Sequence, residues 1–141
     1  MRRNRNGTHE TRRRTLFQAG FVGQLENDIF DIYKDHKVGL RSLATTTPTI
    51  PQLRKEYSDI LENIYRIIEE IDLPKKNKMK FARIFTGIAA RGLVCLDQYE
   101  ELEDGPFDIS KFTRKELVCD MSTFKNTMKL LGFYMNWNVK K

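Results

Sequence analysis

One arginine stands near the start of an unusually apolar segment, where its side chain could bind a carboxylate. Residues 81–96 carry only three clearly polar side chains, which are Arg83, Thr86 and Arg91. The neighbours of Arg83 on a helix face would be apolar or small, and a guanidinium in such a place can donate two parallel hydrogen bonds to a partner's carboxylate. The same arginine could instead lie along the core with its charged head in water. The spacing fits both interpretations.

The side chains that usually carry catalysis are not grouped in this sequence. His9 lies in a polar stretch, and His36 lies at a predicted helix end beside Lys37, where a histidine commonly complements the helix dipole. The sequence contains no phosphate-binding glycine loop, no HExxH zinc motif and no nucleophile elbow. We therefore predict a protein that is not an enzyme and that uses no cofactor.

The two cysteines, Cys95 and Cys119, both lie in apolar patterns of helical spacing. They form no CxxC pair and no Cys/His cluster, so neither a zinc site nor a disulfide framework is indicated. Two buried free thiols fit a reducing compartment, and we expect a cytoplasmic protein. The last apolar run is short and ends in Lys140 and Lys141, so we expect no membrane anchor.

Most of the net charge of +6 belongs to the first fourteen residues, which hold six arginines against one glutamate. The rest of the chain therefore carries a net charge of only +1. A stretch rich in Arg, Asn, Gly and Thr cannot bury apolar surface, so we predict a flexible tail over residues 1–14 and a single helical domain over residues 15–139. Nucleic-acid binding through this tail is the alternative function, although the near-neutral body argues against it as the main one.

Four segments with apolar residues at helical spacing predict an all-α fold. They cover residues 15–36, 51–72, 81–96 and about 109–133, with a proline-containing linker at 41–51 and an acidic loop at 97–106. Pro74 and the lysine-rich residues 75–80 are expected to stop the second helix. The third segment is too short to cross a bilayer and apolar nearly all round, so it should be a central core helix, about residues 80–97, with the others packed around it. Its small residues, including Gly92, should let neighbouring backbones approach closely.

The start of this helix resembles the first homology region of the Bcl-2 family of apoptosis regulators. That region typically reads Asn-Trp-Gly-Arg-Ile/Val, followed by an apolar helix with a glycine nine residues after the arginine. Here Lys80, Phe81, Ala82 and Arg83 stand at the first four of these positions, and Gly92 keeps the spacing to the arginine. The close match covers about 17 residues, and the all-helical layout extends a looser agreement over residues 15–137.

The resemblance implies a Bcl-2-like helical bundle that holds the amphipathic death-motif helix of a pro-apoptotic family protein in an apolar groove. The family arginine, here Arg83, would pair with an aspartate of that ligand, and apolar contacts would supply the affinity. The groove positions that the resemblance implies are Arg83, Ala82, Phe81, Phe85, Thr86 and Ala90 on the core helix, and Leu61, Tyr65 and Ile68 on the second helix.

Two alignments with the family stay open. If the first helix corresponds to the family's first helix, then residues 58–61 and Tyr65 resemble its third homology region. If instead residues 16–20 resemble that region, then the helix over 51–72 is the far wall of the groove and Phe21 replaces the expected aspartate. The first alignment keeps a helix that completes the core.

The compact chain and its departures from the family motifs are typical of a virus-encoded homologue, so we expect inhibition of cell death rather than its promotion. Peripheral attachment to mitochondria is an open alternative to a purely cytoplasmic location. An exposed apolar groove also favours self-association, so a homodimer is a further expectation.

Overall fold

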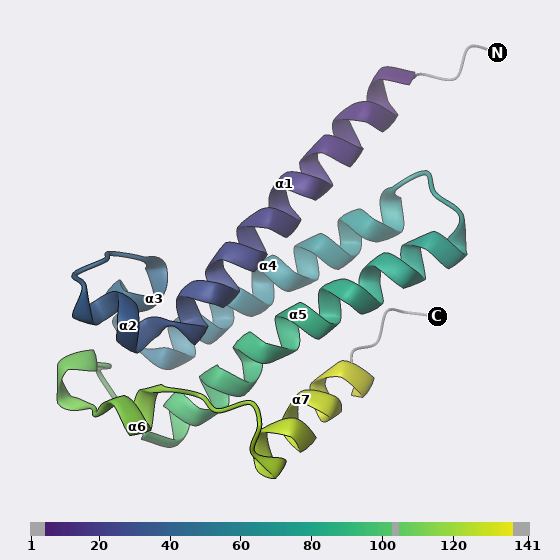
Figure 1. Cartoon of the computed structure of the whole chain (residues 1–141). Coiled ribbons are helices and arrows are strands. Elements are labelled where there is room, and N and C mark those ends of the chain that lie inside the picture. Colours follow the sequence, from purple (N-terminus) through teal and green to yellow (C-terminus); the bar gives the residue numbers. More distant parts are fainter. Residues whose placement is uncertain (1–4, 103–104, 137–141) are drawn as a thin grey trace.

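The computed structural model is all-helical in the residues that it describes, which are 5–102 and 105–136 (Figure 1). No strand occurs in these ranges, which confirms the predicted all-α class. The helices are α1 (Arg5–Phe30), α2 (Ile32–Lys37), α3 (Leu43–Thr46), α4 (Ile50–Glu70), α5 (Lys75–Leu102), α6 (Arg114–Leu117) and α7 (Phe124–Asn136), with the 3-10 turn η1 (Ile109–Lys111) before α6.

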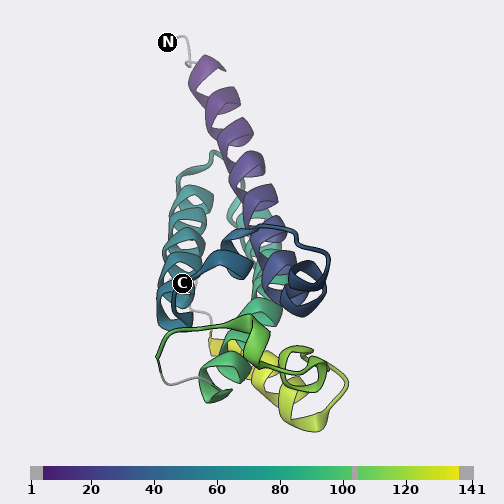
Figure 2. The ribbon, with the colours of Figure 1, turned by 90° about the vertical axis from the view of Figure 1, so that its left-hand side faces the viewer.

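Helix α5 is the central helix, as the apolar segment predicted. It packs against α1, α4, α6 and α7, and Ala89, Val94 and Leu96 on it are buried. Helices α1 and α5 run in the same direction, and α4 is antiparallel to both (Figures 1 and 2). The short helices α2, α3 and α6 gather at one end of the bundle, and the start of α1 lies at the other.

Helix α4 begins and packs as its sequence predicts. The Thr49 side chain accepts a hydrogen bond from the backbone N–H of Gln52, and Pro51 lies in the first turn, where it needs no hydrogen-bond partner. Leu53 and Ile64 belong to a continuous buried stripe along the helix. This stripe faces the bundle, so burial of apolar surface holds α4 in place.

Helix α5 extends beyond the predicted core segment at both ends, which corrects two predictions. The core helix was predicted to begin near residue 80, but the lysine-rich residues 75–80 already form its first turns, and the Pro74 carbonyl accepts hydrogen bonds from the N–H groups of Asn77 and Lys78. The predicted acidic loop is also helical as far as Leu102. Arg54 of α4 binds both Asp97 and Glu100 at 2.6 Å, so these acidic side chains pair with a helix neighbour.

The single helix predicted over residues 109–133 is wrong, since the chain forms η1, α6 and α7 there. The Asp120 carboxylate accepts hydrogen bonds from the backbone N–H and the hydroxyl of Ser122, a local turn that competes with helix. Asn126 then donates to the Asp120 carbonyl at 2.8 Å and fixes the start of α7 against this turn. Apolar spacing alone did not reveal the turn.

The first predicted helix is longer and interrupted. Residues 5–14 of the predicted tail continue α1 toward its N-terminus, and the chain turns at Asp31 before α2. Gly39, with a φ of 72°, follows α2 in the left-handed region that favours glycine, a conformation that commonly ends a helix. The flexibility of the tail stays a prediction. Residues 1–4 of the predicted tail and residues 137–139 of the predicted domain lie outside the described residues.

Within the described ranges, none of the helices combines the length and the apolar character that crossing a membrane requires.

Candidate functional site

The three polar side chains of the apolar α5 segment have different surroundings, and this difference defines the site. Thr86 is buried and fully bonded within the core. Its hydroxyl donates to the carbonyl of Ala82 at 2.7 Å, and it shares a short hydrogen bond with the hydroxyl of Tyr65 on α4. Thr86 therefore ties α4 to α5 and is not available to a ligand.

Arg91 is also committed, because it forms an ion pair with Glu26 of α1. The guanidinium donates to both carboxylate oxygens, with 2.7 Å from Nη2 to Oε2, and it stacks over the ring of Phe30 at 4.3 Å. Glu26 is only 2 % exposed, and hydrogen bonding to it raises the pKa of Arg91. A buried carboxylate with both oxygens bonded is stable only while its partner stays in place. This pair therefore fixes α1 against α5.

The ion pair between Glu26 and Arg91 was not predicted, although the sequence holds a signal for it. Glu26 lies between Val22 and Ile29 on the apolar face of the predicted first helix, where a carboxylate needs a partner. The partner lies 65 positions away in the sequence, so the spacing of residues could not identify it.

Arg83 is exposed, and its side chain has no hydrogen bond or ion pair with any residue that the structure describes. One helical turn after it, Gly87 lies about 3.9 Å from the ring of Tyr134, measured from where a Cβ would be. Arg83 therefore lies beyond the C-terminal part of α7. Beside it on α5, Ile84 and Ile88 are 58 % and 48 % exposed. We call Arg83, Ile84, Ile88 and Tyr134 the Arg83 surface.

Most of the other predicted groove residues are buried between α4 and α5. The rings of Tyr65 and Phe85 meet edge to face, with centroids 5.4 Å apart and an angle of 69° between the planes. Phe81 is half-buried near the start of α5. The buried positions are Leu61, Tyr65 and Ile68 on α4 and Ala82, Phe85, Thr86 and Ala90 on α5. The two helices pack directly on each other along these residues, so a ligand helix would have to separate them to enter there.

The two cysteines are buried, as predicted, and both thiols are free. They lie next to each other: hydrogen bonding to Cys119 and burial raise the pKa of Cys95, and the same bond lowers the pKa of Cys119. Asn126 places its amide 3.7 Å from the Cys119 sulfur. Across residues 5–102 and 105–136, no group of three or more His, Cys, Asp or Glu side chains is arranged to hold a metal ion.

Comparison of the chain with protein-family models, with curated proteins and with solved structures gave no match.

Proposed function

We propose that the protein is a helix-binding regulator of the Bcl-2 type, which inhibits cell death by binding the amphipathic death-motif helix of a pro-apoptotic protein. The proposal rests on one observation in the structure: the guanidinium of Arg83 is exposed beside exposed apolar side chains of the central helix and pairs with none of the described residues. The resemblance to the family's first homology region supports the same arginine, because Arg83 and Gly92 keep the family spacing although Lys80, Phe81 and Ala82 differ from the typical residues.

The contrast between the two arginines of the apolar segment is the main support. Arg91 has both a carboxylate and an aromatic ring as partners, so its charged side chain serves to stabilise the fold. Arg83 has no such partner among the described residues, and an unpaired guanidinium retains its capacity for a bidentate carboxylate. A ligand helix with one acidic residue would supply that carboxylate.

The ligand would lie along the Arg83 surface. Its acidic residue would pair with Arg83, while apolar residues at helical spacing would contact Ile84 and Ile88 on one side and Tyr134 on the other. This position differs from the groove implied by the resemblance, because α4 and α5 are packed together along Leu61, Tyr65 and Phe85. Binding at the Arg83 surface requires no separation of core helices.

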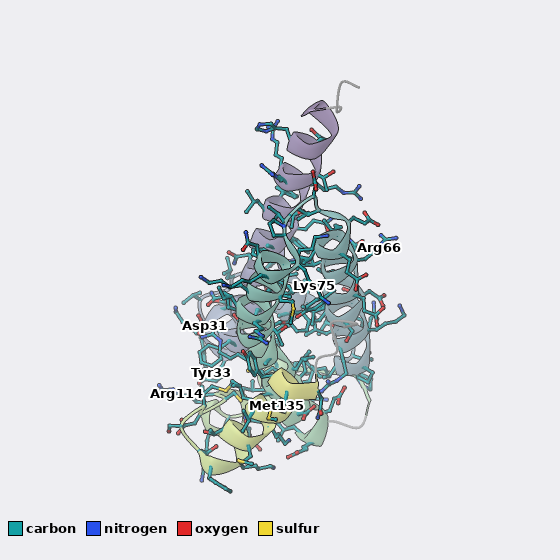
Figure 3. The ribbon with its side chains drawn as sticks, turned by 90° about the vertical axis from the view of Figure 1, so that its right-hand side faces the viewer. Asp31, Tyr33, Arg66, Lys75, Arg114 and Met135 are labelled. Carbon is teal, nitrogen blue, oxygen red and sulfur yellow. The ribbon has the colours of Figure 1, made fainter. Side chains whose placement is uncertain are left out.

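Calorimetric titration with a panel of death-motif peptides tests the proposal. We expect sub-micromolar binding of at least one peptide and a loss of roughly 1–3 kcal/mol in Arg83→Ala, as for a lost charge-assisted hydrogen bond. Arg114→Ala is the matched control, because Arg114 is also an exposed arginine but lies on α6 (Figure 3).

A second arm separates a direct pair from a general charge effect. In a peptide whose acidic residue is replaced by its amide, Arg83→Ala should cause little further loss, because the two changes remove the same interaction. If the panel does not bind, or if Arg83→Ala and Arg114→Ala have the same affinity as the unmodified protein, the proposed function is wrong.

A further inference from the structure

A second candidate site lies between the first half of α1 and the hairpin formed by α4 and α5. Helix α1 diverges from this hairpin toward its N-terminus (Figure 1). The opening contains a hollow of about 420 Å³. Its apolar walls come from four parts of the chain: Leu16 of α1, Ile68 of α4, Ile71 and Leu73 of the α4–α5 connection, and Phe81 of α5. We call it the end hollow.

Two cationic side chains lie at the end hollow. Arg12 and Lys78 line it directly. The Lys78 ammonium is bonded to the backbone carbonyl of Glu69 at 2.6 Å. The Arg12 side chain is exposed and forms no hydrogen bond or ion pair with residues 5–102 or 105–136. Because α1 and α5 are parallel, residues 12–14 and 75–80 bring further arginines and lysines to the same end of the molecule (Figure 1).

Exposed apolar side chains continue from the hollow onto α1. Leu16 is 68 % exposed although it lines the hollow, and Phe17 beside it is 78 % exposed. An apolar surface bordered by cations is typical of proteins that bind an anionic membrane surface. A nucleic acid would pair with the cations but would leave these apolar side chains and the hollow without a partner.

We propose that this end of the molecule binds anionic lipid, with an acyl chain in the end hollow and the headgroup paired with Arg12. Charge complementarity selects an anionic headgroup, and the apolar walls select a hydrocarbon chain rather than a second phosphate. The site shares neither its residues nor its ligand with the Arg83 surface, so it stands independently of the proposed function.

Sedimentation of the full-length protein with vesicles tests this proposal. We expect binding to phosphatidylcholine vesicles that contain phosphatidylserine, and little binding to phosphatidylcholine alone. Arg12→Glu should weaken vesicle binding about fivefold or more, since each cation near an anionic surface contributes measurably. Leu16→Ser should weaken it by a similar factor, because the side chain loses its contact with the acyl chain.

The chain offers a matched control for both variants. Arg114 and Val118 are an exposed arginine and an exposed apolar residue four positions apart, as Arg12 and Leu16 are, but they are not part of the end hollow. Arg114→Glu and Val118→Ser should leave vesicle binding unchanged. Thermal unfolding of all four variants checks that the fold is retained.

Two further probes distinguish the sources of the anion. Dihexanoyl phosphatidylserine, added as dissolved single molecules, should bind to the unmodified protein and bind less well to Leu16→Ser, whereas glycerophosphoserine, which has no chains, should not bind.

A fluorescent oligonucleotide tests the competing partner, a nucleic acid. If Arg12→Glu weakens oligonucleotide and vesicle binding alike while Leu16→Ser weakens neither, the basic end binds polyanions and the lipid proposal is wrong. Equal binding of all variants to vesicles would also overturn it.

Discussion

At the scale of single residues, Gly92 of α5 packs closely against the ring of Tyr57 on α4. A Cβ at position 92 would lie 2.7 Å from the Tyr57 hydroxyl oxygen and 2.9 Å from the ring carbon that bears it. The hydroxyl donates to the carbonyl of Ala89 at 2.9 Å, and burial raises the pKa of Tyr57, so it remains a protonated donor. The small residue expected to admit a neighbouring backbone therefore admits an aromatic side chain.

Gly92→Ala should lower the free energy of unfolding by about 1–3 kcal/mol, because the added methyl group must displace a fixed and fully buried ring. Chemical denaturation measures the change. Gly20→Ala is the matched control, since it is also a helix-interior glycine and nothing lies within 4 Å of its added Cβ. This control should instead stabilise the protein by about 0.5–1 kcal/mol through its higher helix propensity. Equal effects of the two substitutions would contradict the close contact.

At the scale of elements, α7 is held to the end of α5 partly by charge. Lys129 binds Glu101 at 2.9 Å and lies 3.5 Å from Asp97, and Lys125 binds Glu101 at 3.0 Å. Hydrogen bonds from Lys129 and Lys125 hold the pKa of Glu101 below its ordinary value of 4.5. The outer side of α7 carries exposed apolar residues such as Met135 (Figure 3), so these ion pairs help to select which side of α7 faces α5.

The Glu101 interaction gives stability a pH dependence of known sign. A carboxylate whose pKa is lower in the folded state contributes stability above its unfolded pKa and loses it as the pH falls through the folded pKa. We expect Glu101→Gln to lower Tm at pH 7 and to match the unmodified protein at a pH well below 4.5. Thermal unfolding from pH 7 to pH 2.5 measures this, and the difference should be small because the pair is exposed. A Tm difference that grows toward low pH would contradict the assignment.

At the scale of the whole molecule, the start of α1 projects from the bundle at the end away from α2, α3 and α6 (Figures 1 and 2). The first buried side chain of α1 among those described is Thr15, whose hydroxyl donates to the carbonyl of Thr11. Three residues later, Gln18 accepts a hydrogen bond from Asn63 of α4. Contacts that stabilise the bundle therefore begin near residue 15.

Deletion of residues 2–10 should change Tm by less than about 3 °C, because it removes no buried side chain from the described part of α1. Deletion of residues 2–18 is the contrasting variant. It also removes Thr15 and Gln18, and it should lower Tm clearly. Thermal unfolding of both proteins tests the predicted boundary between tail and domain. A large loss of stability in the shorter deletion would show that the first turns of α1 belong to the folded domain.

The sequence by itself determined those features that depend on neighbours a few positions apart. Apolar spacing predicted the all-α class and the central place of α5, because a segment that is apolar nearly all round can be buried only by surrounding helices. The cap at Thr49 and the end of α2 at Gly39 are local in the same sense. The acidic run after residue 96 was wrongly predicted to be a loop, because its partner Arg54 lies on another helix.

Only the tertiary structure decided which faces are covered and which charges meet. It packed α4 directly on α5, so the predicted groove residues lie in the core while Arg83 stays exposed. It joined Glu26 to Arg91, and its parallel α1 and α5 placed two basic runs at one end beside an apolar hollow. These contacts join residues far apart in the chain, and helix periodicity describes one face of one helix without naming the helix that will cover it.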